Sequence, residues 1–490
     1  MASPKSLLVC GTTSDAGKTL VTTALCRAFV RRGVSVAPFK SQNMSNNSMV
    51  CADGSEIGRA QWVQALAART PPEAAMNPVL LKPGGDQESH VVVMGQPAGR
   101  ISSREFAGDR TRLRDAAYAA FDDLRGRVDV VVAEGAGSPA EINLRSGDYI
   151  NMGLARHGRV PTIVVADIDR GGAFAALYGT VALLDEADRS LVAGFVMNKF
   201  RGDARLLAPG LEELTRRTGR QFYGTMPWSS DVWLDSEDAL ELAARRPEPS
   251  SATARVAVIR LPRISNFTDV DALGLEPSLE VVFATSPAAI ADADLLVVPG
   301  TRATLADLSW LRERGLDRAI AEHVASGRPV LGVCGGFQML GEHIGDPEGV
   351  EGRARAAADG LGLLDVRTRF ASDKTLKLSE DLWRGIDVHG YEIHHGRMAV
   401  GSGDPFPGGV RTGMVWGTMW HGALEDDAFR RAWLAAALPD HNPGVPVSFS
   451  DARHERLDLL GDLAEEHLDV EALLDLATGT IQPPFGGVLS

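Results

Sequence analysis

The chain has 490 residues, which is longer than one ordinary compact core requires and favours two or three domains. Hydrophobic residues make up 44% of it and charged residues 23%, close to the average of folded globular proteins, so broad disorder is excluded. The formal net charge of -14 at pH 7 argues against a nucleic-acid partner. The four cysteines are widely spaced and no apolar stretch reaches about 18 residues, so we expect a reduced, cytoplasmic location and no membrane span.

The first half of the chain alternates short apolar runs with segments of helical periodicity. This alternation predicts a doubly wound α/β domain with a mainly parallel sheet, which we place at residues 1–245. The expected strands are residues 6–10, 34–39, 128–133, 162–166 and 191–197. The expected helices include residues 20–30, 61–68 and 113–124.

A break in composition separates this half from the second. Residues 246–254 combine prolines with small polar residues and predict an interdomain linker. The alternation then resumes, which predicts a second doubly wound α/β domain at residues 255–445. Its expected elements are strands at 256–259, 279–283, 295–298 and 330–333 and helices at 304–314 and 318–325. Residues 446–490 carry charged residues and spaced leucines, which predict a short helical C-terminal extension.

A glycine-rich segment follows the first expected strand. Residues 11–19 read Gly-Thr-Thr-Ser-Asp-Ala-Gly-Lys-Thr and open the first expected helix, so their backbone N–H groups can hold phosphates. Lys18 can reach the β- and γ-phosphates of ATP, and the Thr19 hydroxyl can bind Mg²⁺. The spacing is one residue longer than in the usual Walker A motif, which makes this a variant loop. The residues expected to contact ATP here are Thr13, Asp15, Gly17, Lys18 and Thr19.

Other polar residues follow further strands of the first domain. Glu134 ends one expected strand and is a candidate Mg²⁺ ligand, with a solvated loop carboxylate as the alternative; Asp53 is another candidate ligand. Asn198 ends a second strand and is a candidate contact for adenine. An Asn/Ser-rich loop at residues 40–48 suits a carboxylate substrate or its acyl phosphate, although such a composition is also typical of a turn. The candidate substrate residues of this loop are Lys40, Gln42 and Asn43.

One cysteine lies among glycines at an expected junction of strand and helix. Cys334 stands in the segment Gly-Val-Cys-Gly-Gly, which is the pattern of a nucleophile elbow. A helix N-terminus at this point favours the thiolate. Cys10 and Cys26 lie in apolar segments and are expected in the core, whereas Cys51 is indeterminate.

A nucleophilic cysteine needs a base, and three histidines compete for this role. His421 follows an apolar, strand-like run, and His394 and His395 are its rivals. Backbone N–H groups of Gly300 and Gly335 can form an oxyanion hole, as acyl transfer requires.

The two halves resemble known families. The second half is similar to class I, triad-type glutamine amidotransferases in Pro-Gly-Thr at 299–301, Gly-Val-Cys-Gly-Gly-Phe-Gln at 332–338 and Gly-Thr-Met-Trp-His-Gly at 417–422. The first half resembles dethiobiotin synthetase in its variant P-loop and in Glu-Gly-Ala-Gly at 134–137. Fused in this order, the two halves resemble the family of cobyrinate and cobyric acid amidating enzymes.

Three further segments, at residues 40–48, 167–172 and 390–394, resemble the cobyric acid synthase family in particular. This resemblance implies a P-loop NTPase-like domain followed by a flavodoxin-like glutaminase, with Cys334 as nucleophile and His421 as base. It implies ATP and Mg²⁺ as cofactors, and glutamine and a corrinoid polycarboxylate as substrates. The expected reaction is amidation of the b, d, e and g carboxylates of adenosylcobyrinic acid a,c-diamide.

One departure from the resemblance leaves the third catalytic residue unassigned. Many class I glutaminases carry His-x-Glu, whereas Gly422 and Ala423 follow His421 here and the next acid is Glu425.

Two alternatives remain, of which one differs in the carboxylates that are amidated and the other in what the P-loop serves. Cobyrinic acid a,c-diamide synthase would share the architecture, but the Ser-Gln-Asn-Met-Ser segment at 41–45 argues against it. A partitioning or positioning ATPase switch normally has a lysine near the start of its loop, where this chain has Thr12 and Thr13. Such a switch would also have no use for Cys334.

Overall fold

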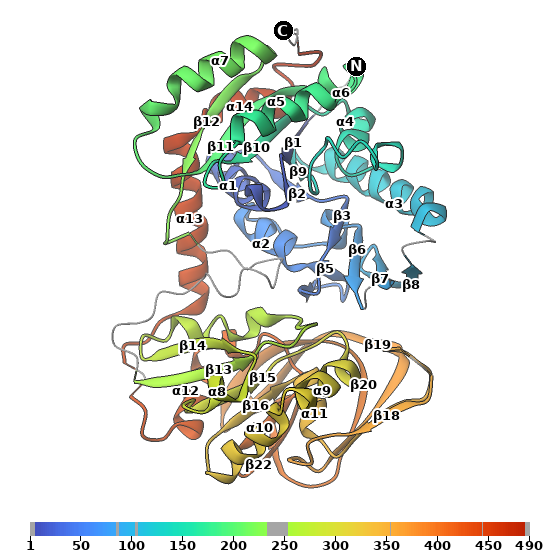
Figure 1. Ribbon diagram of the computed structural model, residues 1–490, viewed down its shortest axis with the longest axis vertical. Coiled ribbons are helices and arrows are strands. Elements are labelled where there is room, and N and C mark those ends of the chain that lie inside the picture. The colour runs from blue at the N-terminus through green and yellow to red at the C-terminus, as the bar shows by residue number, and fades with distance from the viewer. Residues whose placement is uncertain are drawn as a thin grey trace.

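The computed structural model describes residues 5–84, 88–102, 106–232, 253–352, 354–442 and 444–485. Two α/β units lie one above the other in Figure 1, and the long helix α13 (Phe449–His467) runs from one to the other. None of the helices in these ranges has the length and apolar character that crossing a membrane needs.

The first unit is built on a six-stranded parallel sheet in the order β12–β11–β10–β1–β9–β2. Its strands are β1 (Ser6–Gly11), β2 (Val36–Phe39), β9 (Val130–Glu134), β10 (Thr162–Asp167), β11 (Val192–Phe200) and β12 (Gln221–Pro227). Along β1, Leu7 and Val9 enter one core whereas Leu8 and Cys10 enter another, because successive side chains of a strand point to opposite faces. Both faces are therefore buried, which confirms the doubly wound prediction.

Helices cover both faces of this sheet. They are α1 (Lys18–Arg31), α2 (Arg59–Ala67), α3 (Phe106–Arg127), α4 (Met152–Gly158), α5 (Ala173–Leu183), α6 (Glu186–Arg189) and α7 (Ala208–Thr218). Between β2 and α3 the chain forms small sheets that the sequence did not predict. They comprise β3 (Gln42–Met44), β6 (Val79–Pro83), β7 (Glu88–Val93) and β8 (Gln96–Ser102), with the ribbon β4 (Ser48–Val50) and β5 (Glu56–Gly58). These strands face the second unit in Figure 1.

The C-terminal helices belong to the core of the first unit. Leu457 and Leu460 of α13 and Leu473 of α14 (Val470–Thr478) are buried in the same cluster as Val9 of β1. Phe449, at the start of α13, is buried in the core of the second unit instead. The helical prediction for this segment is confirmed, but it is a structural part of both units rather than an appendage.

The second unit has a seven-stranded sheet in the order β14–β13–β15–β16–β23–β22–β21. The first five strands are parallel and follow the 2-1-3-4-5 order of flavodoxin-like folds, as predicted. The strands are β13 (Ala254–Ile259), β14 (Leu279–Ala284), β15 (Leu295–Val298), β16 (Val330–Val333), β21 (Asp404–Phe406), β22 (Gly409–Thr412) and β23 (Val415–Thr418). Its helices are α8 (Pro287–Ile290), α9 (Thr304–Glu313), α10 (Leu316–Ala325), α11 (Gly335–Leu340) and α12 (Asp427–Ala437).

A second, four-stranded sheet in this unit was not predicted. It consists of β17 (His343–Asp346), β18 (Ala356–Asp359), β19 (Val366–Trp383) and β20 (Ile386–Val400), of which β19 and β20 form a long antiparallel hairpin. The predicted linker ends earlier than expected because Ala254 already pairs with β14 as part of β13. Linker residues 246–252 lie outside the described residues.

Candidate active sites

The glycine-rich segment after β1 folds back over the start of α1. Gly17 has a φ of 95°, and a Cβ atom there would lie 1.9 Å from Nδ2 of Asn198, so only glycine fits. The Asn198 amide donates to the Ala16 carbonyl oxygen at 3.0 Å and therefore holds the loop. Lys18 Nζ donates to the carbonyl oxygens of Thr13 and Ser14 at 2.9 and 2.8 Å, which places its charge against the loop.

A buried carboxylate beside this loop accepts hydrogen bonds from side chains of three other parts of the chain. Glu134, 1% exposed at the end of β9, accepts hydrogen bonds from Thr19 Oγ1 at 2.9 Å, Lys40 Nζ at 2.9 Å and Gln64 Nε2 at 2.6 Å. Burial raises the pKa of Glu134, but the Lys40 charge outweighs this and lowers it below its usual value. The group is therefore ionised at neutral pH. Gln64 lies inside α2, where no sequence signal distinguished it.

The Thr19 hydroxyl and the Glu134 carboxylate fit a Mg²⁺ ion. Mg²⁺ prefers a few protein oxygen ligands together with phosphate oxygens, and both groups lie at the phosphate-binding loop. Asp53 makes its hydrogen bonds outside this cluster, and its role as a Mg²⁺ ligand stays a prediction. It lies in an exposed turn, where its carboxylate accepts from the backbone N–H and hydroxyl of Ser55 at 2.9 and 2.6 Å.

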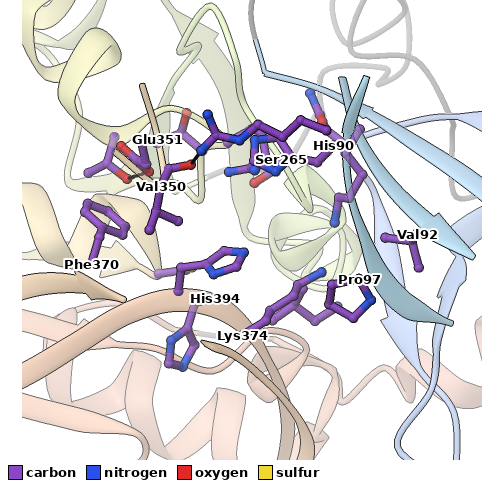
Figure 2. A pocket seen from close by; sticks show the side chains of 18 of the residues that line it. His90, Val92, Pro97, Ser265, Val350, Glu351, Phe370, Lys374 and His394 are labelled. Carbon is purple, nitrogen blue, oxygen red and sulfur yellow. Dashed lines mark hydrogen bonds between the residues drawn. The ribbon is translucent and has the colours of Figure 1, made fainter. Parts of the chain in front are cut away.

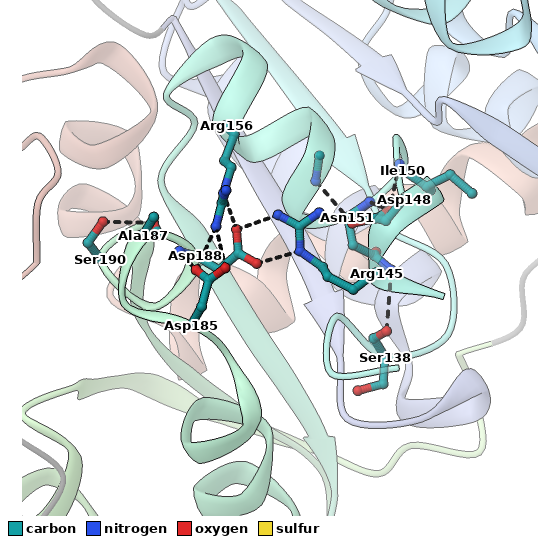
Figure 3. A network of polar contacts seen from close by, with 11 residues as sticks. Ser138, Arg145, Asp148, Ile150, Asn151, Arg156, Asp185, Ala187, Asp188 and Ser190 are labelled. Carbon is teal, nitrogen blue, oxygen red and sulfur yellow. Dashed lines mark hydrogen bonds and ion pairs between the residues drawn. The ribbon is translucent and has the colours of Figure 1, made fainter. Parts of the chain in front are cut away.

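The loop after Glu134 is anchored by the polar network in Figure 3. The side chain of Asn151 accepts from Ala136 N at 3.0 Å and donates to Ala136 O at 2.7 Å. Asp148 accepts from the backbone N–H of Asn151 at 2.8 Å, next to the start of α4. Arg145 and Asp188 pair at 2.5 Å and fix the segment before Asp148. Because this loop begins at Glu134, the network holds the carboxylate at the sheet edge.

The remaining predicted residues of the first unit lie around this edge. Gln42 accepts from the Tyr149 hydroxyl, and Asn43 donates to Gln61 Oε1 at 3.1 Å. The Asp15 carboxylate is exposed and pairs with Arg170 at 2.9 Å.

In the second unit, Cys334 occupies a strained turn between β16 and α11. Its φ of 49° and ψ of -109° are unusual for a residue with a side chain, and strain of this kind accumulates at functional sites. Its backbone N–H donates to the Thr418 carbonyl oxygen at 2.7 Å. A Cβ atom on Gly335 would lie 2.7 Å from Cγ2 of Thr301, so glycine is needed where these loops meet. The elbow conformation is thus the one that the sequence pattern predicts.

A carboxylate orients the histidine beside this cysteine. His421 is 1% exposed, and its Nδ1 lies 2.7 Å from Oδ2 of Asp269, whose other oxygen accepts from Gly422 N at 2.9 Å. Burial lowers the pKa of His421, but the charge of Asp269 and its contact with Cys334 raise it to about 10. Cys334, His421 and Asp269 thus form a nucleophile–base–carboxylate arrangement.

The sequence did not reveal Asp269, which precedes His421 by 152 residues in the short 3-10 helix η6 (Phe267–Val270). No spacing in the sequence connects these two residues, because only the folding of the sheet brings them into contact. Glu425, the next acid after His421, instead pairs with Arg59 and Arg453 at 2.8 Å each.

The rival histidines have other partners. His394 lies 2.8 Å from Glu392 and 2.9 Å from the Gly396 carbonyl oxygen. His395 contacts the Ala371 carbonyl oxygen, and burial lowers its pKa to about 4. The other cysteines are buried, and burial raises the pKa of each above the usual thiol value. The geometry therefore distinguishes Cys334 and His421 from these groups.

Comparison with known proteins places both units in one family. Two family models match: a CobQ/CobB/MinD/ParA nucleotide binding domain over residues 7–242 and a CobB/CobQ-like glutamine amidotransferase domain over residues 255–429. The chain is 66% identical over 487 residues to the cobyric acid synthase of Mycolicibacterium vanbaalenii, 67% over 481 residues to that of Mycolicibacterium gilvum and 64% over 491 residues to that of Mycobacterium tuberculosis H37Ra. These matches cover 97 or 98% of both chains in every case. The chain belongs to the cobyric acid synthase family.

It is accordingly an ATP-dependent, glutamine-hydrolysing ligase that acts on small molecules. The family assignment confirms the resemblance and sets aside the positioning ATPase alternative.

In this cobyric acid synthase family member, a cavity of about 530 Å³ lies where the two units meet. Cys334 and His421 line it from the second unit, and Lys82 lines it from the first. Figure 2 shows His90 of the first unit and His394 of the second unit in the lining. Gly300 lies against the base, since a Cβ atom there would be 3.0 Å from Cε1 of His421. The glutaminase centre therefore opens onto the other unit.

Proposed function

We propose that this chain amidates the b, d, e and g carboxylates of adenosylcobyrinic acid a,c-diamide, with glutamine as the nitrogen source, to give cobyric acid. One observation carries the proposal: a nucleophilic cysteine centre and a phosphate-binding centre with a buried carboxylate lie on two units that share a cavity.

In the glutaminase unit, the Cys334 thiolate attacks the carboxamide carbon of glutamine. The His421 imidazolium gives its proton to the departing ammonia, and Asp269 keeps the ring oriented through Nδ1. The backbone N–H groups of Gly300 and Gly335 are assigned to the developing oxyanion. Water, deprotonated by His421, then hydrolyses the thioester to glutamate.

In the synthetase unit, ATP phosphorylates a substrate carboxylate, and ammonia displaces phosphate to leave the amide. Lys18 neutralises charge on the transferring phosphoryl group, and the backbone from Thr13 to Gly17 holds the other phosphates. Mg²⁺, held by Thr19 and Glu134, would supply charge neutralisation on the phosphates. Lys40 is assigned to the acyl phosphate, and Gln42 and Asn43 to the substrate.

Two further assignments are part of this proposal. The division at residues 1–245, 255–445 and 446–490 separates synthetase, glutaminase and C-terminal helices along the chain, although those helices complete the synthetase core. A cytoplasmic location agrees with the use of ATP and with four cysteines that are all unpaired.

Mass spectrometry of the corrinoid product tests the proposal. Purified protein is incubated with ATP, Mg²⁺, glutamine and adenosylcobyrinic acid a,c-diamide, and the number of carboxyl-to-amide conversions is read from the product mass. Four conversions are expected. Conversion of cobyrinic acid at only two positions, with no turnover of the a,c-diamide, would instead identify the a,c-diamide synthase reaction.

A further inference from the structure

The cavity between the two units has more cationic than acidic side chains in its lining, since Glu348 and Glu351 are its two acids. Its lining includes four Lys and Arg side chains, namely Lys82, Arg100, Arg302 and Lys374. A cation in a cavity wall is stabilised when an anion or a carbonyl oxygen lies within hydrogen-bond distance.

Three of the four cations already have partners. Lys82 pairs with Glu56 at 2.7 Å, and Lys374 pairs with the same carboxylate. Arg100 donates to the carbonyl oxygens of Gly349 and Val350. Each of these three groups thus has at least one anion or carbonyl oxygen within hydrogen-bond distance.

Arg302 differs from the other three. Among the described residues, its guanidinium makes no hydrogen bond and no ion pair within 4.0 Å, although its backbone N–H is fixed to the Arg263 carbonyl oxygen at 2.9 Å. Glu351 acts on it electrostatically, but the two oxygens of that carboxylate accept from Thr304 Oγ1 at 2.8 Å and Leu305 N at 3.1 Å. Arg302 therefore differs from the other three cations, because no described residue gives its guanidinium a direct anionic partner.

Arg302 lies in a segment that packs against the turn of Cys334. Arg302 follows Thr301, and Thr301 packs against Gly335, the residue after Cys334. Ile264 and Thr301 also form a β-bridge, which ties the 301–302 segment to the chain that leads into Asp269. Arg302 thus lines the same cavity as Cys334 and is close enough for the charge of a Cys334 thiolate to act on it.

We propose that Arg302 binds the α-carboxylate of glutamine and so fixes the side-chain amide on Cys334. Glutamine carries one carboxylate, and the planar guanidinium can hold it through two parallel hydrogen bonds. Because the contact is made to a part of the substrate remote from the reacting carbon, Arg302 is a positioning and specificity residue. This inference rests on the proposed glutaminase reaction.

The test compares two reagents that modify Cys334. The diazoketone 6-diazo-5-oxo-L-norleucine carries the α-carboxylate of glutamine, whereas iodoacetamide has no such group. In Arg302→Ala, we expect labelling of Cys334 by the diazoketone, followed by peptide mass, to slow about 10- to 100-fold, the range for loss of a charged hydrogen bond. The iodoacetamide rate should stay within about twofold of wild type, because the thiol itself is unchanged.

Arg100→Ala is the matched control, since it removes a guanidinium from the same cavity that already has partners. It should leave diazoketone labelling near the wild-type rate. Equal slowing in the Arg100 and Arg302 variants, or a wild-type diazoketone rate in Arg302→Ala, would overturn the assignment.

A kinetic measurement keeps the inference testable if the alanine variant is poorly folded. Arg302→Lys and Arg302→Gln should raise KM for glutamine with a smaller change in KM for 4-aminobutanamide, which lacks the α-carboxylate, while ammonium-dependent amidation continues. An equal rise for both amides would reject Arg302 as the carboxylate contact. Absence of glutamine hydrolysis and of diazoketone labelling in the wild type would reject the proposed glutaminase reaction itself, which is a distinct outcome.

Discussion

Cys334 is the residue on which we propose that glutamine use depends. It is 6% exposed and held in a strained turn, so a substitution there removes the nucleophile and leaves the neighbouring loops in place. We expect Cys334→Ala to abolish amidation with glutamine but to retain amidation with ammonium at high pH, since ammonia enters after the cysteine step. Assays of the corrinoid product with each nitrogen source measure this, and normal turnover of Cys334→Ala with glutamine would contradict the assignment.

His421 differs from the other histidines through its carboxylate partner. We expect His421→Ala to lower glutaminase activity by about 10²-fold or more, the usual range for loss of a positioned acid–base group. His395→Ala should have a much smaller effect, because the His395 ring contacts a backbone carbonyl oxygen. Equal losses in the two variants would leave the base unidentified.

Asp269 controls the proton on His421. Burial alone would lower the pKa of His421, and the charge of Asp269 is the main effect that raises it to about 10. A raised pKa keeps the imidazolium until the pH passes that value, so the form that protonates ammonia is lost on the alkaline side. Asp269→Asn should therefore move the alkaline limb of glutaminase kcat/KM to lower pH and reduce its maximum. An unchanged limb would mean that another group sets this pKa.

At the scale of elements, we propose that the variant P-loop and α1 serve the synthetase reaction alone. Lys18→Ala should remove amide formation with glutamine and with ammonium, whereas hydrolysis of glutamine at Cys334 should persist because that centre lies in the other unit. This pattern is the opposite of the one expected for Cys334→Ala. Normal amidation by Lys18→Ala with ammonium would show that the acyl-phosphate step does not occur at this loop.

Helix α13 stabilises the synthetase unit through its leucine face. Leu460 is fully buried in the core that contains Val9 and Val21. Leu460→Ala should lower the free energy of unfolding by about 2–5 kcal/mol, as for other buried leucines. Leu206→Ala makes the same chemical change at a side chain that is 80% exposed, and denaturant unfolding should show almost no loss there. Similar losses would mean that α13 does not contribute to this core.

At the scale of the whole molecule, polar contacts fix the substrate loop of one unit to the glutaminase of the other. Ser48 N donates to Asn266 Oδ1 at 2.9 Å, three residues before Asp269. The Ser48 hydroxyl donates to Glu56, which also binds Lys82 and, from β19, Lys374. Burial raises the pKa of Glu56, but the two lysines lower it below its usual value, so the carboxylate is charged.

Glu56→Gln should loosen the contact between the units. The substitution leaves two largely buried lysines without their counter-ion. Removal of one partner of a buried ion pair lowers the free energy of unfolding by about 3–5 kcal/mol. We expect the thermal midpoint to fall and amidation with glutamine to fall more than amidation with ammonium. Glu213→Gln, which breaks exposed pairs with Arg216 and Arg217, is the control and should change neither. Equal loss with both nitrogen sources would assign Glu56 to stability alone.

The sequence by itself determined the features that depend on local pattern. Short apolar runs between segments of helical periodicity defined the parallel strands. The glycines around Lys18 and Cys334 defined the two loops, because a phosphate cradle and a nucleophile elbow each require a fixed local backbone. Tertiary structure alone decided which distant groups meet. Asp269 contacts His421 across the sheet, and Gln64 contacts Glu134 from inside a helix. Arg302 differs from the other cations of the cavity only because each of those has a partner in the fold. Helices α13 and α14 pack onto the first sheet because burial of apolar surface stabilises contacts between segments irrespective of their separation along the chain.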